Sequence, residues 1–361
     1  MKILQVINSL NIGGAEKLLV DSIPLYKAKG INMELLLLNG TKTPFFYELE
    51  KKGVNIHFLS ADDIKTVYNP LHIFQIIPYL KQYDIIHVHL FPALYWVALA
   101  KWLSLSKKTL IYTEHSTKNR RIKNKGIWWI LDKFIYKRYS KIVSISLEVD
   151  TAIKLHLFEK DAKFCIINNG INLSNFNKTL DKKAKEVEKT KITIIQVAGF
   201  REEKDQATVI RALQYLPENV TLLLVGEGKN RIDCENLVKE LNLLDKVLFL
   251  GIRTDVPELL ESSYIVVVSS HWEGFGLTAV EGMAAGKPVV ASNVPGLNNI
   301  VNEAGLLFTQ GDEKDLAKKI QSLIDNPDFY NKIAQNCKER AKLYDINTMV
   351  DKYFELYKML I

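Results

Sequence analysis

Residues 264–281 read YIVVVSSHWEGFGLTAVE, an apolar run followed by a turn with two glycines and then by a helical pattern. The apolar run Tyr264–Val268 predicts a strand of a parallel sheet that is buried on both faces. The small residues of Gly282-Met-Ala-Ala-Gly286, which come next, suit a helix packed closely on that sheet. The stretch therefore predicts one strand–turn–helix unit of an α/β fold.

The turn between this strand and this helix has the properties of an anion site. Gly274 and Gly276 let the main chain approach a ligand, and the helix start presents unpaired N–H groups and a positive dipole end, which suits a phosphate. Glu273 lies before the helix, where it would accept hydrogen bonds from hydroxyl groups. Glu281, about two turns further along, could reach a second polyol. Together these groups suit a ligand in which a diphosphate joins a sugar to a ribose.

Two other interpretations of the same stretch stay open. It can be an ordinary strand–turn–helix whose glutamates are surface residues. Alternatively, Glu273 and Glu281 can be the paired carboxylates of a glycosidase, one protonating the leaving oxygen while the other attacks or activates water. The glycosidase is less favoured, because a hydrolase needs no phosphate cradle and this turn supplies one.

Strand-like runs alternate with helix-length segments along most of the chain, which predicts right-handed βαβ units and open parallel sheets. The pattern starts at the N-terminus and starts again at residue 192. The first set of predicted strands is Ile3–Ile7, Met33–Leu38, Asn55–Leu59, Ile85–His89, Thr109–Thr113 and Lys141–Ser146; the second is Ile192–Val197, Thr221–Val225, Lys246–Leu250, Tyr264–Val268 and Pro288–Ala291.

The fold class is therefore α/β, with two Rossmann-like, doubly wound domains. We place the first domain at residues 1–172, a polar, lysine-rich linker at 173–191, the second domain at 192–345 and a separate C-terminal helix at 346–361. In open α/β sheets ligands bind at the carboxyl ends of the strands. The turn with Gly274 and Gly276 follows a predicted strand and is therefore at the edge where ligands bind.

Length and composition fit this division. The 361 residues suit two domains of about 170 residues each. No apolar run reaches the roughly 18 residues that would span a bilayer, and the N-terminus lacks the pattern of a signal peptide. Three widely separated cysteines argue against a disulfide framework. We therefore expect a cytoplasmic protein with reduced thiols.

The charge is uneven. Residues 1–178 hold 25 Lys/Arg against 14 Asp/Glu, a net +11, and the remainder holds 23 against 27, a net −4. Between Lys101 and Lys141, twelve basic and two acidic residues are interleaved with tryptophan, tyrosine and phenylalanine. This composition suits peripheral contact with anionic lipid at the inner face of the cell membrane, but a solvated basic face is equally compatible with it. Without a recognisable nucleic-acid-binding motif, we expect no nucleic-acid partner.

The motif resembles that of a known family. The pattern Glu273-x7-Glu281, followed by AAGKPVVAS at 284–292 and GLNNIV at 296–301, resembles the signature of retaining glycosyltransferases of family four. The resemblance covers nearly the whole chain and is strongest over Ile192–Asp315. It implies the GT-B architecture, with two domains facing each other across a cleft and a last helix that returns to the N-terminal domain. The nucleotide sugar would bind the second domain and the acceptor the first.

The resemblance also implies roles for residues outside the motif. Lys204 follows the first strand of the second domain, where a cation can neutralise a diphosphate leaving group. The family usually has an arginine five residues before this lysine; here that position is Gly199, and Arg201 is the candidate replacement. His115, at the end of a strand, matches a family histidine that approaches the donor sugar. His87 and His89 alternate on one strand, and packing is the safer interpretation for both.

Two further turns complete the expected site. Gly13 and Gly14 follow the first strand and open a helix, and Ile252 lies in the segment that, by resemblance, binds the base through its main chain; uracil is our choice because it is common in the family. Neither Gly13-Gly14 nor Gly226-Glu-Gly228 has the spacing of a dinucleotide fingerprint, which disfavours an NAD enzyme. The expected donor-binding residues are Gly13, Gly14, Arg201, Lys204, Ile252, Glu273, Gly274, Phe275, Gly276, Leu277, Thr278 and Glu281.

From these features we predict a retaining, metal-independent glycosyltransferase of polysaccharide biosynthesis, with His115, Glu273 and Lys204 as catalytic residues. Its partners would be a nucleotide-sugar donor, favouring UDP, and a glycan or lipid-linked acceptor. No cofactor is expected, because the adjacent Asp62 and Asp63 do not form the Asp-x-Asp motif of a metal site. A nucleotide-sugar epimerase of the same architecture and a non-catalytic sugar-nucleotide sensor remain as alternatives.

Overall fold

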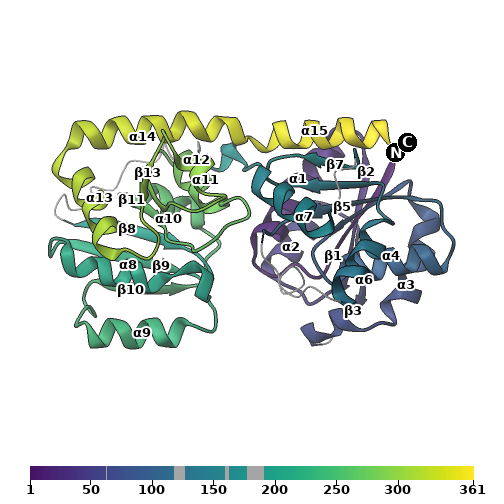
Figure 1. Cartoon of the computed structure of the whole chain (residues 1–361), viewed down its shortest axis with the longest axis horizontal. Helices are drawn as coiled ribbons and strands as arrows, with labels where there is room; N and C mark the ends of the chain where they lie inside the picture. The colour runs from purple at the N-terminus through teal and green to yellow at the C-terminus, as the bar shows by residue number, and fades with distance from the viewer. Residues whose placement is uncertain (62, 118–126, 159–161, 177–190) are drawn as a thin grey trace. The chain divides into compact units, whose positions relative to one another are not determined.

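The computed structural model describes residues 1–61, 63–117, 127–158, 162–176 and 191–361. Most of the predicted linker (177–190), part of the basic segment (118–126) and Asp62 lie outside these residues. The chain forms two compact units, one made of residues 1–170 with 346–361 and the other of residues 171–345. Figure 1 shows the elements of both units and labels most of them.

The first unit contains a seven-stranded parallel sheet in the order β3-β2-β1-β4-β5-β6-β7. The strand order reverses between β1 and β4, which is where open α/β sheets bind ligands at the carboxyl ends of their strands. The strands are β1 Lys2–Ile7, β2 Asn32–Asn39, β3 Ile56–Ser60, β4 Ile85–His89, β5 Thr109–Glu114, β6 Lys141–Ser144 and β7 Phe164–Ile166.

Helices pack on both faces of this sheet because side chains alternate along each strand. On one face, Ile3 and Ile7 of β1 join the apolar side chains of α1, α2 and α15. On the other, Leu4 and Val6 join α3, α4, α6 and α7. The helices are α1 Gly14–Ala28, α2 Pro44–Lys51, α3 His72–Gln82, α4 Ala93–Leu103, α6 Ile127–Tyr136, α7 Leu147–Leu157 and α15 Ile346–Met359.

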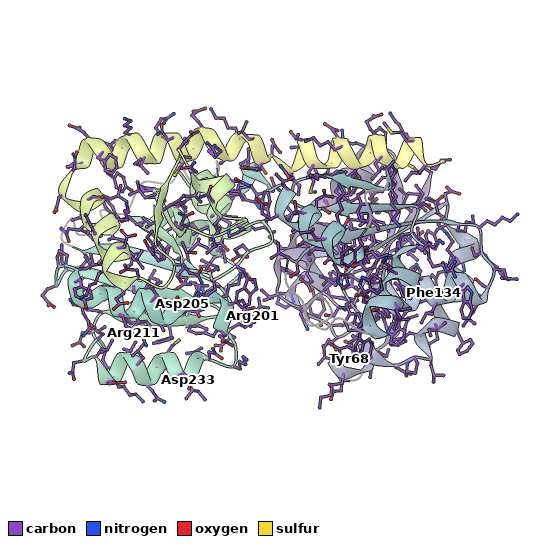
Figure 2. The ribbon with its side chains drawn as sticks, viewed as in Figure 1. Tyr68, Phe134, Arg201, Asp205, Arg211 and Asp233 are labelled. Carbon is purple, nitrogen blue, oxygen red and sulfur yellow. The ribbon has the colours of Figure 1, made fainter. Side chains whose placement is uncertain are left out.

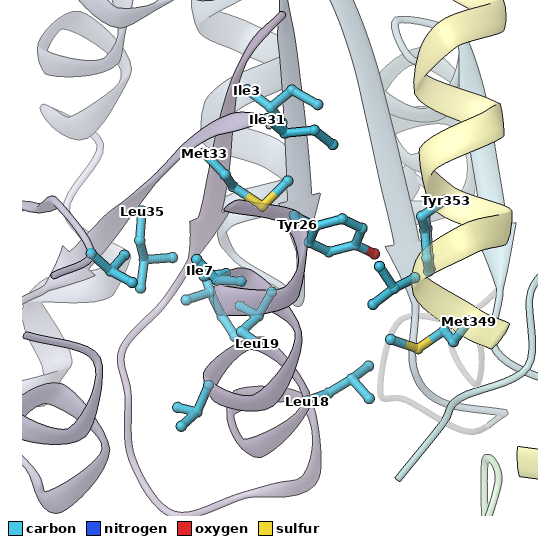
Figure 3. Packing of buried hydrophobic residues seen from close by; sticks show 14 of the residues in the cluster. Ile3, Ile7, Leu18, Leu19, Tyr26, Ile31, Met33, Leu35, Met349 and Tyr353 are labelled. Carbon is cyan, nitrogen blue, oxygen red and sulfur yellow. The ribbon is translucent and has the colours of Figure 1, made fainter. Parts of the chain in front are cut away.

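The last helix, α15, is part of the core of the first unit. Its buried residues Met349 and Tyr353 lie in the same cluster as Tyr26 of α1, as Figure 3 shows. Tyr26 and Tyr357 face each other with ring centroids 5.8 Å apart. The final turns of the chain therefore stabilise the sheet that the first residues begin.

The second unit contains a six-stranded parallel sheet in the order β10-β9-β8-β11-β12-β13. The order again reverses at the centre, between β8 and β11. The strands are β8 Ile192–Val197, β9 Val220–Val225, β10 Val247–Gly251, β11 Ile265–Val268, β12 Val289–Ser292 and β13 Leu306–Phe308, and the helices are α8 Gln206–Ala212, α9 Arg231–Glu240, α10 Val256–Ser262, α11 Leu277–Ala284, α12 Asn298–Val301, α13 Glu313–Asp325 and α14 Pro327–Ala341.

The predicted fold class and the predicted strands are confirmed. Two strands escaped prediction, β7 (Phe164–Ile166) and β13 (Leu306–Phe308), each with three residues. Both are outer strands whose apolar runs are too short to separate from loop sequence. The predicted strand Lys141–Ser146 was also too long, because β6 ends at Ser144 and Ser146 caps α7 by accepting from the N–H of Val149.

Close packing holds α11 against the centre of the second sheet. A Cβ added to Gly282 would lie 2.9 Å from the Cβ and both Cγ atoms of Val266 on β11. Val266 is fully buried and β-branched, so it cannot move aside easily. Gly282 therefore sets how closely α11 approaches the sheet.

We expect Gly282→Ala to destabilise the protein. Overpacking costs about 1–3 kcal/mol, against a gain in helix propensity of at most about 1 kcal/mol. Urea unfolding followed by circular dichroism measures the difference. In the double variant Gly282→Ala/Val266→Ala, the loss should be smaller than the sum of the two single losses. Unchanged stability of Gly282→Ala would contradict this packing.

Candidate active site

The start of α11 lies at the carboxyl edge of the second sheet and has no side-chain cap. Gly276 is its N-cap, with φ 90° and no side-chain capping bond. A side chain here would be strained by that φ, and its Cβ would lie 2.5 Å from Cδ2 of Leu297. The main-chain N–H groups of the first turn therefore have no capping side chain, and they lie at the positive end of the helix dipole. This arrangement can bind an anion.

The turns after β8 and β11, neighbouring strands at the reversal, are bonded to each other. The hydroxyl of Ser269 donates to the carbonyls of Lys204 and Asp205 at 2.9 and 2.8 Å, and the side-chain amide of buried Gln196 donates to the Lys204 carbonyl at 2.8 Å. The N–H of His271 donates to the carbonyl of Glu203 at 2.8 Å. These bonds fix the main chain of both turns before any ligand arrives.

Lys204 and Glu273 form an ion pair between the two turns. The Lys204 Nζ lies 2.5 Å from Oε1 of Glu273, and the hydroxyl of Ser270 donates to the same oxygen at 2.8 Å. Only 17% of the Lys204 side chain and 16% of the Glu273 side chain are exposed. The structure thus brings together two of the three predicted catalytic residues, at the edge where α11 begins.

Arg201 folds back over Gly199, the position where the family arginine would stand. Its Nε lies 3.6 Å from the place that a Cβ of Gly199 would take, and 3.3 Å from Oε1 of Glu203. The side chain is 58% exposed. Figure 2 labels Arg201 together with Asp205, which ends the same turn. A guanidinium is therefore present at this turn, although it originates two residues later in the sequence.

The other predicted residues of the second unit differ in what they offer. Phe275 is buried and packs edge-to-face on Tyr344, with ring centroids 5.3 Å apart, so its main chain is what remains for a ligand. The hydroxyl of Thr278 donates to the carbonyl of Val197 at 3.2 Å. Ile252 is exposed and follows Gly251, which has φ 64°. Gly274, Leu277 and Glu281 are each partly exposed in the turn or on α11.

Sequence reasoning missed the polar residues that surround His271. Its Nε2 lies 3.8 Å from a carboxylate oxygen of Asp205, and its Nδ1 lies 3.0 Å from the amide nitrogen of Gln310. His271 stands inside the motif and could have been noticed there. No sequence pattern links it to Gln310, 39 residues away.

In the first unit, Gly13 and Gly14 occupy the start of α1. Gly13 is the N-cap, with extended dihedral angles and no side-chain capping bond, and α1 begins at Gly14. The Glu16 carboxylate folds back here, so that a Cβ on Gly13 would lie within contact distance of its Oε2. Negative charge thus already occupies the region of this helix start, which suits its dipole.

His115 follows β5 in the first unit and contacts a second histidine. Its Nε2 lies 3.0 Å from Nδ1 of His89, and its N–H donates to a carboxylate oxygen of Glu114 at 3.2 Å. Burial lowers the pKa of His115 to about 4 and that of His87 to about 3. These imidazoles are therefore neutral at physiological pH. His89, for which packing was the safer interpretation, is in contact with a predicted catalytic residue.

Two kinds of feature are absent from the described ranges. No group of three or more His, Cys, Asp or Glu side chains there is arranged to hold a metal ion. None of the helices described combines the length and the apolar character needed to cross a bilayer.

Two family models match successive parts of the chain. The model described as Glycosyltransferase Family 4 matches residues 12–175, and the one described as Glycosyl transferases group 1 matches residues 177–342. This chain belongs to glycosyltransferase family four. The predicted family membership is thereby confirmed, and the protein is a glycosyltransferase.

Similar proteins are glycosyltransferases from several bacteria. The UDP-Gal:alpha-D-GlcNAc-diphosphoundecaprenol alpha-1,3-galactosyltransferase of Escherichia coli is 25% identical over 296 residues, which cover 77% of this chain and 76% of that protein. An uncharacterized glycosyltransferase of Haemophilus influenzae is 27% identical and covers 96% of this chain and 97% of its own length. The N,N'-diacetylbacillosaminyl-diphospho-undecaprenol alpha-1,3-N-acetylgalactosaminyltransferase of Campylobacter jejuni is 30% identical over 56% of each chain.

Solved structures of the same architecture cover nearly the whole of this family four chain. Anabaena Alr3699/HepE in complex with UDP and glucose superposes with a TM-score of 0.87 at 24% identity, covering 99% of this chain and 100% of that one. WaaG, a glycosyltransferase involved in lipopolysaccharide biosynthesis, gives a TM-score of 0.74 at 16% identity, with 98% and 99% covered. These likenesses establish the GT-B type of fold.

Proposed function

We propose that this enzyme transfers a sugar from a UDP-sugar to a hydroxyl group of a lipid-linked glycan, with retention at the anomeric carbon and without a metal ion. The observation that carries the proposal is the uncapped start of α11 beside the Lys204–Glu273 pair. A helix start and an ammonium group can bind a diphosphate, whereas a carboxylate accepts hydrogen bonds from sugar hydroxyls.

Positive groups of the second unit stabilise the leaving diphosphate. In the reaction, the bond between the anomeric carbon and the diphosphate oxygen breaks, and its electron pair leaves with UDP. The acceptor oxygen forms the new bond to the same carbon, and its proton is transferred to the departing diphosphate. The N–H groups of Leu277 and Thr278 and the ammonium of Lys204 then face the growing negative charge. Arg201 takes the place of the family arginine that is missing at Gly199.

Carboxylates hold the hydroxyl groups of the donor. Among the described residues, both hydrogen bonds to Glu273 fall on Oε1, so Oε2 can accept from a sugar hydroxyl. Glu281, further along α11, binds the ribose. The main chain at Ile252 binds the uracil, and the main chain of Gly274 lines the diphosphate. In the first unit, His115 is the residue that we assign to the reacting sugar.

The choice of UDP and of a lipid-linked acceptor rests on the relatives. The Escherichia coli relative is named for a UDP-galactose donor and a diphosphoundecaprenol acceptor, the Campylobacter jejuni relative for a diphospho-undecaprenol acceptor, and the HepE structures hold UDP or UDP-glucose. A role in polysaccharide biosynthesis follows from that acceptor class. The first unit binds the acceptor, and the second binds the nucleotide sugar.

The basic segment supports contact with anionic lipid at the inner face of the cell membrane. Its two acids are withdrawn from the surface, since Glu114 accepts from the hydroxyl of Tyr136 and Asp132 lies 2.8 Å from Nε2 of His156. Exposed aromatic and aliphatic side chains stand among the cations, including Trp128 and Ile130 of α6. Apolar side chains beside lysines are what an interfacial surface needs.

Lys204→Ala and Glu273→Ala should each lower kcat/KM for sugar transfer by roughly 10²–10³, because each removes a group that binds charge or hydroxyls in the transition state. Both variants should unfold at nearly the wild-type temperature. Lys246→Ala is the matched control, because Lys246 is 13% exposed, lies 3.0 Å from a Glu218 carboxylate oxygen and sits at the opposite edge of the same sheet. Near-normal turnover in either site variant would contradict these roles.

Transfer with retention and without metal has a direct test. Incubation with a UDP-sugar and a short diphospholipid glycan should give a product whose anomeric proton, followed by NMR, has the coupling of the donor. Excess EDTA should leave the rate unchanged. Inversion at the anomeric carbon would contradict retention. Loss of activity in EDTA that a divalent ion restores would contradict metal independence. Formation of a new epimer from the donor alone would favour a nucleotide-sugar epimerase. Tight binding of UDP without any turnover would favour a non-catalytic sensor.

Membrane contact should depend on anionic lipid and on salt. The protein should float with vesicles of phosphatidylglycerol at low ionic strength and much less at 1 M salt, where the screening length is about 3 Å. Ile130→Ala should reduce flotation, whereas Ile232→Ala should not. Both isoleucines are exposed, at 63% and 68%, but Ile232 belongs to α9 of the second unit. Absence of flotation at low salt would rule the contact out.

A further inference from the structure

A chain of hydrogen bonds runs inward from His115 through the buried centre of the first unit. The Nε2 of His115 lies 3.0 Å from Nδ1 of His89, and Nε2 of His89 lies 2.8 Å from Oε1 of Gln5. The side-chain nitrogen of Gln5 then donates to the hydroxyl of Tyr357 at 3.2 Å. His89, Gln5 and Tyr357 are all at most 3% exposed. The chain thus connects the end of β5 to β4, β1 and α15.

The chain continues from Tyr357 to the neighbouring strands. The Tyr357 hydroxyl lies 2.7 Å from Nδ1 of His87, and Nε2 of His87 lies 2.7 Å from the hydroxyl of Thr113. That hydroxyl lies 3.0 Å from the hydroxyl of Tyr353. Each of these groups is buried. Because a buried polar group without a hydrogen-bond partner is destabilising, each of them needs the hydrogen bond described.

The contact with the sulfur of Met33 determines the orientation of the Gln5 side-chain amide. The side-chain nitrogen of Gln5 lies 3.5 Å from Sδ of Met33, and a thioether can only accept. If the Gln5 amide were turned over, its oxygen would face that sulfur, and two acceptors would be in contact. The NH2 group therefore faces Met33 and Tyr357, and Oε1 faces His89.

The tautomers of two histidines follow from this orientation. Because Oε1 of Gln5 only accepts, Nε2 of His89 carries a proton. Burial lowers the pKa of His89 well below its usual value, so the ring is neutral and its Nδ1 has no proton. Nδ1 of His89 must then accept, and the donor is Nε2–H of His115.

We propose that Gln5 and His89 are positioning residues that hold neutral His115 as its Nε2–H tautomer and thereby reserve its Nδ1 as a hydrogen-bond acceptor for a substrate hydroxyl. Within the described part of the chain, Nδ1 of His115 has no hydrogen-bond partner, which agrees with a free lone pair. The inference deepens the proposed function and rests on the role given there to His115. It also accounts for a histidine, His89, that packing alone would not require.

Long-range 1H–15N NMR of the ¹⁵N-histidine-labelled, full-length protein tests the tautomers without any measurement of activity. The signals of His115 are identified by their loss in His115→Gln. We expect His115 and His89 both to be protonated at Nε2. Protonation of His115 at Nδ1 would overturn the proposal, whether or not the enzyme transfers a sugar as proposed.

Variants of Gln5 test the coupling to catalysis. Gln5→Met removes the acceptor at similar volume, so His115 should populate both tautomers and kcat should fall roughly tenfold, with the donor KM within about twofold. Tyr353→Phe, at the far end of the chain, is the control and should change neither quantity.

The outcomes separate the two claims. A single Nε2–H tautomer that persists in Gln5→Met would overturn the positioning role. Mixed tautomers with unchanged kcat would uphold the positioning but contradict the catalytic role of His115. If Gln5→Met does not fold, the tautomer of the wild-type protein still decides the proposal.

Discussion

The proposed donor site depends on where α11 begins. Gly276 takes a φ of 90° at a point where Leu297 leaves no room for a Cβ, so glycine alone fits there. A few residues later, Gly282 brings the same helix against Val266 in the middle of the sheet. The two glycines together fix the helix axis and its start. The N–H groups at the start of α11 consequently lie at the carboxyl edge of the sheet, where the proposal places the diphosphate.

The rest of the site is built around this helix start by bonds between turns. Ser269, Gln196 and the N–H of His271 hold the turn after β8 against the turn after β11. Lys204 and Glu273 then meet as a partly buried ion pair. A diphosphate and a sugar would enter a place where a cation and an anion are already held in position. Little reorganisation is then required at the moment of reaction, which is the condition for strong electrostatic stabilisation.

How much the sequence predicts depends on how local the cause is. Short sequence patterns predict most of the strands and the turn at Gly276. They also predict that the candidate site residues come directly after strands. β7 and β13 were missed because three apolar residues make no pattern. The hydrogen bonds from His115 to His89 and from His89 to Gln5 join three strands. The position of the Arg201 side chain beside Gly199 depends on the shape of one turn. Such contacts appear only once the chain is folded.

The most direct measurement of the role of the α11 start is a crystal structure of this protein with UDP. We predict that oxygens of the diphosphate lie within about 3.2 Å of the main-chain nitrogens of Leu277 and Thr278, with the Lys204 ammonium beside them. A diphosphate bound elsewhere, with the first turn of α11 left to solvent, would contradict that role.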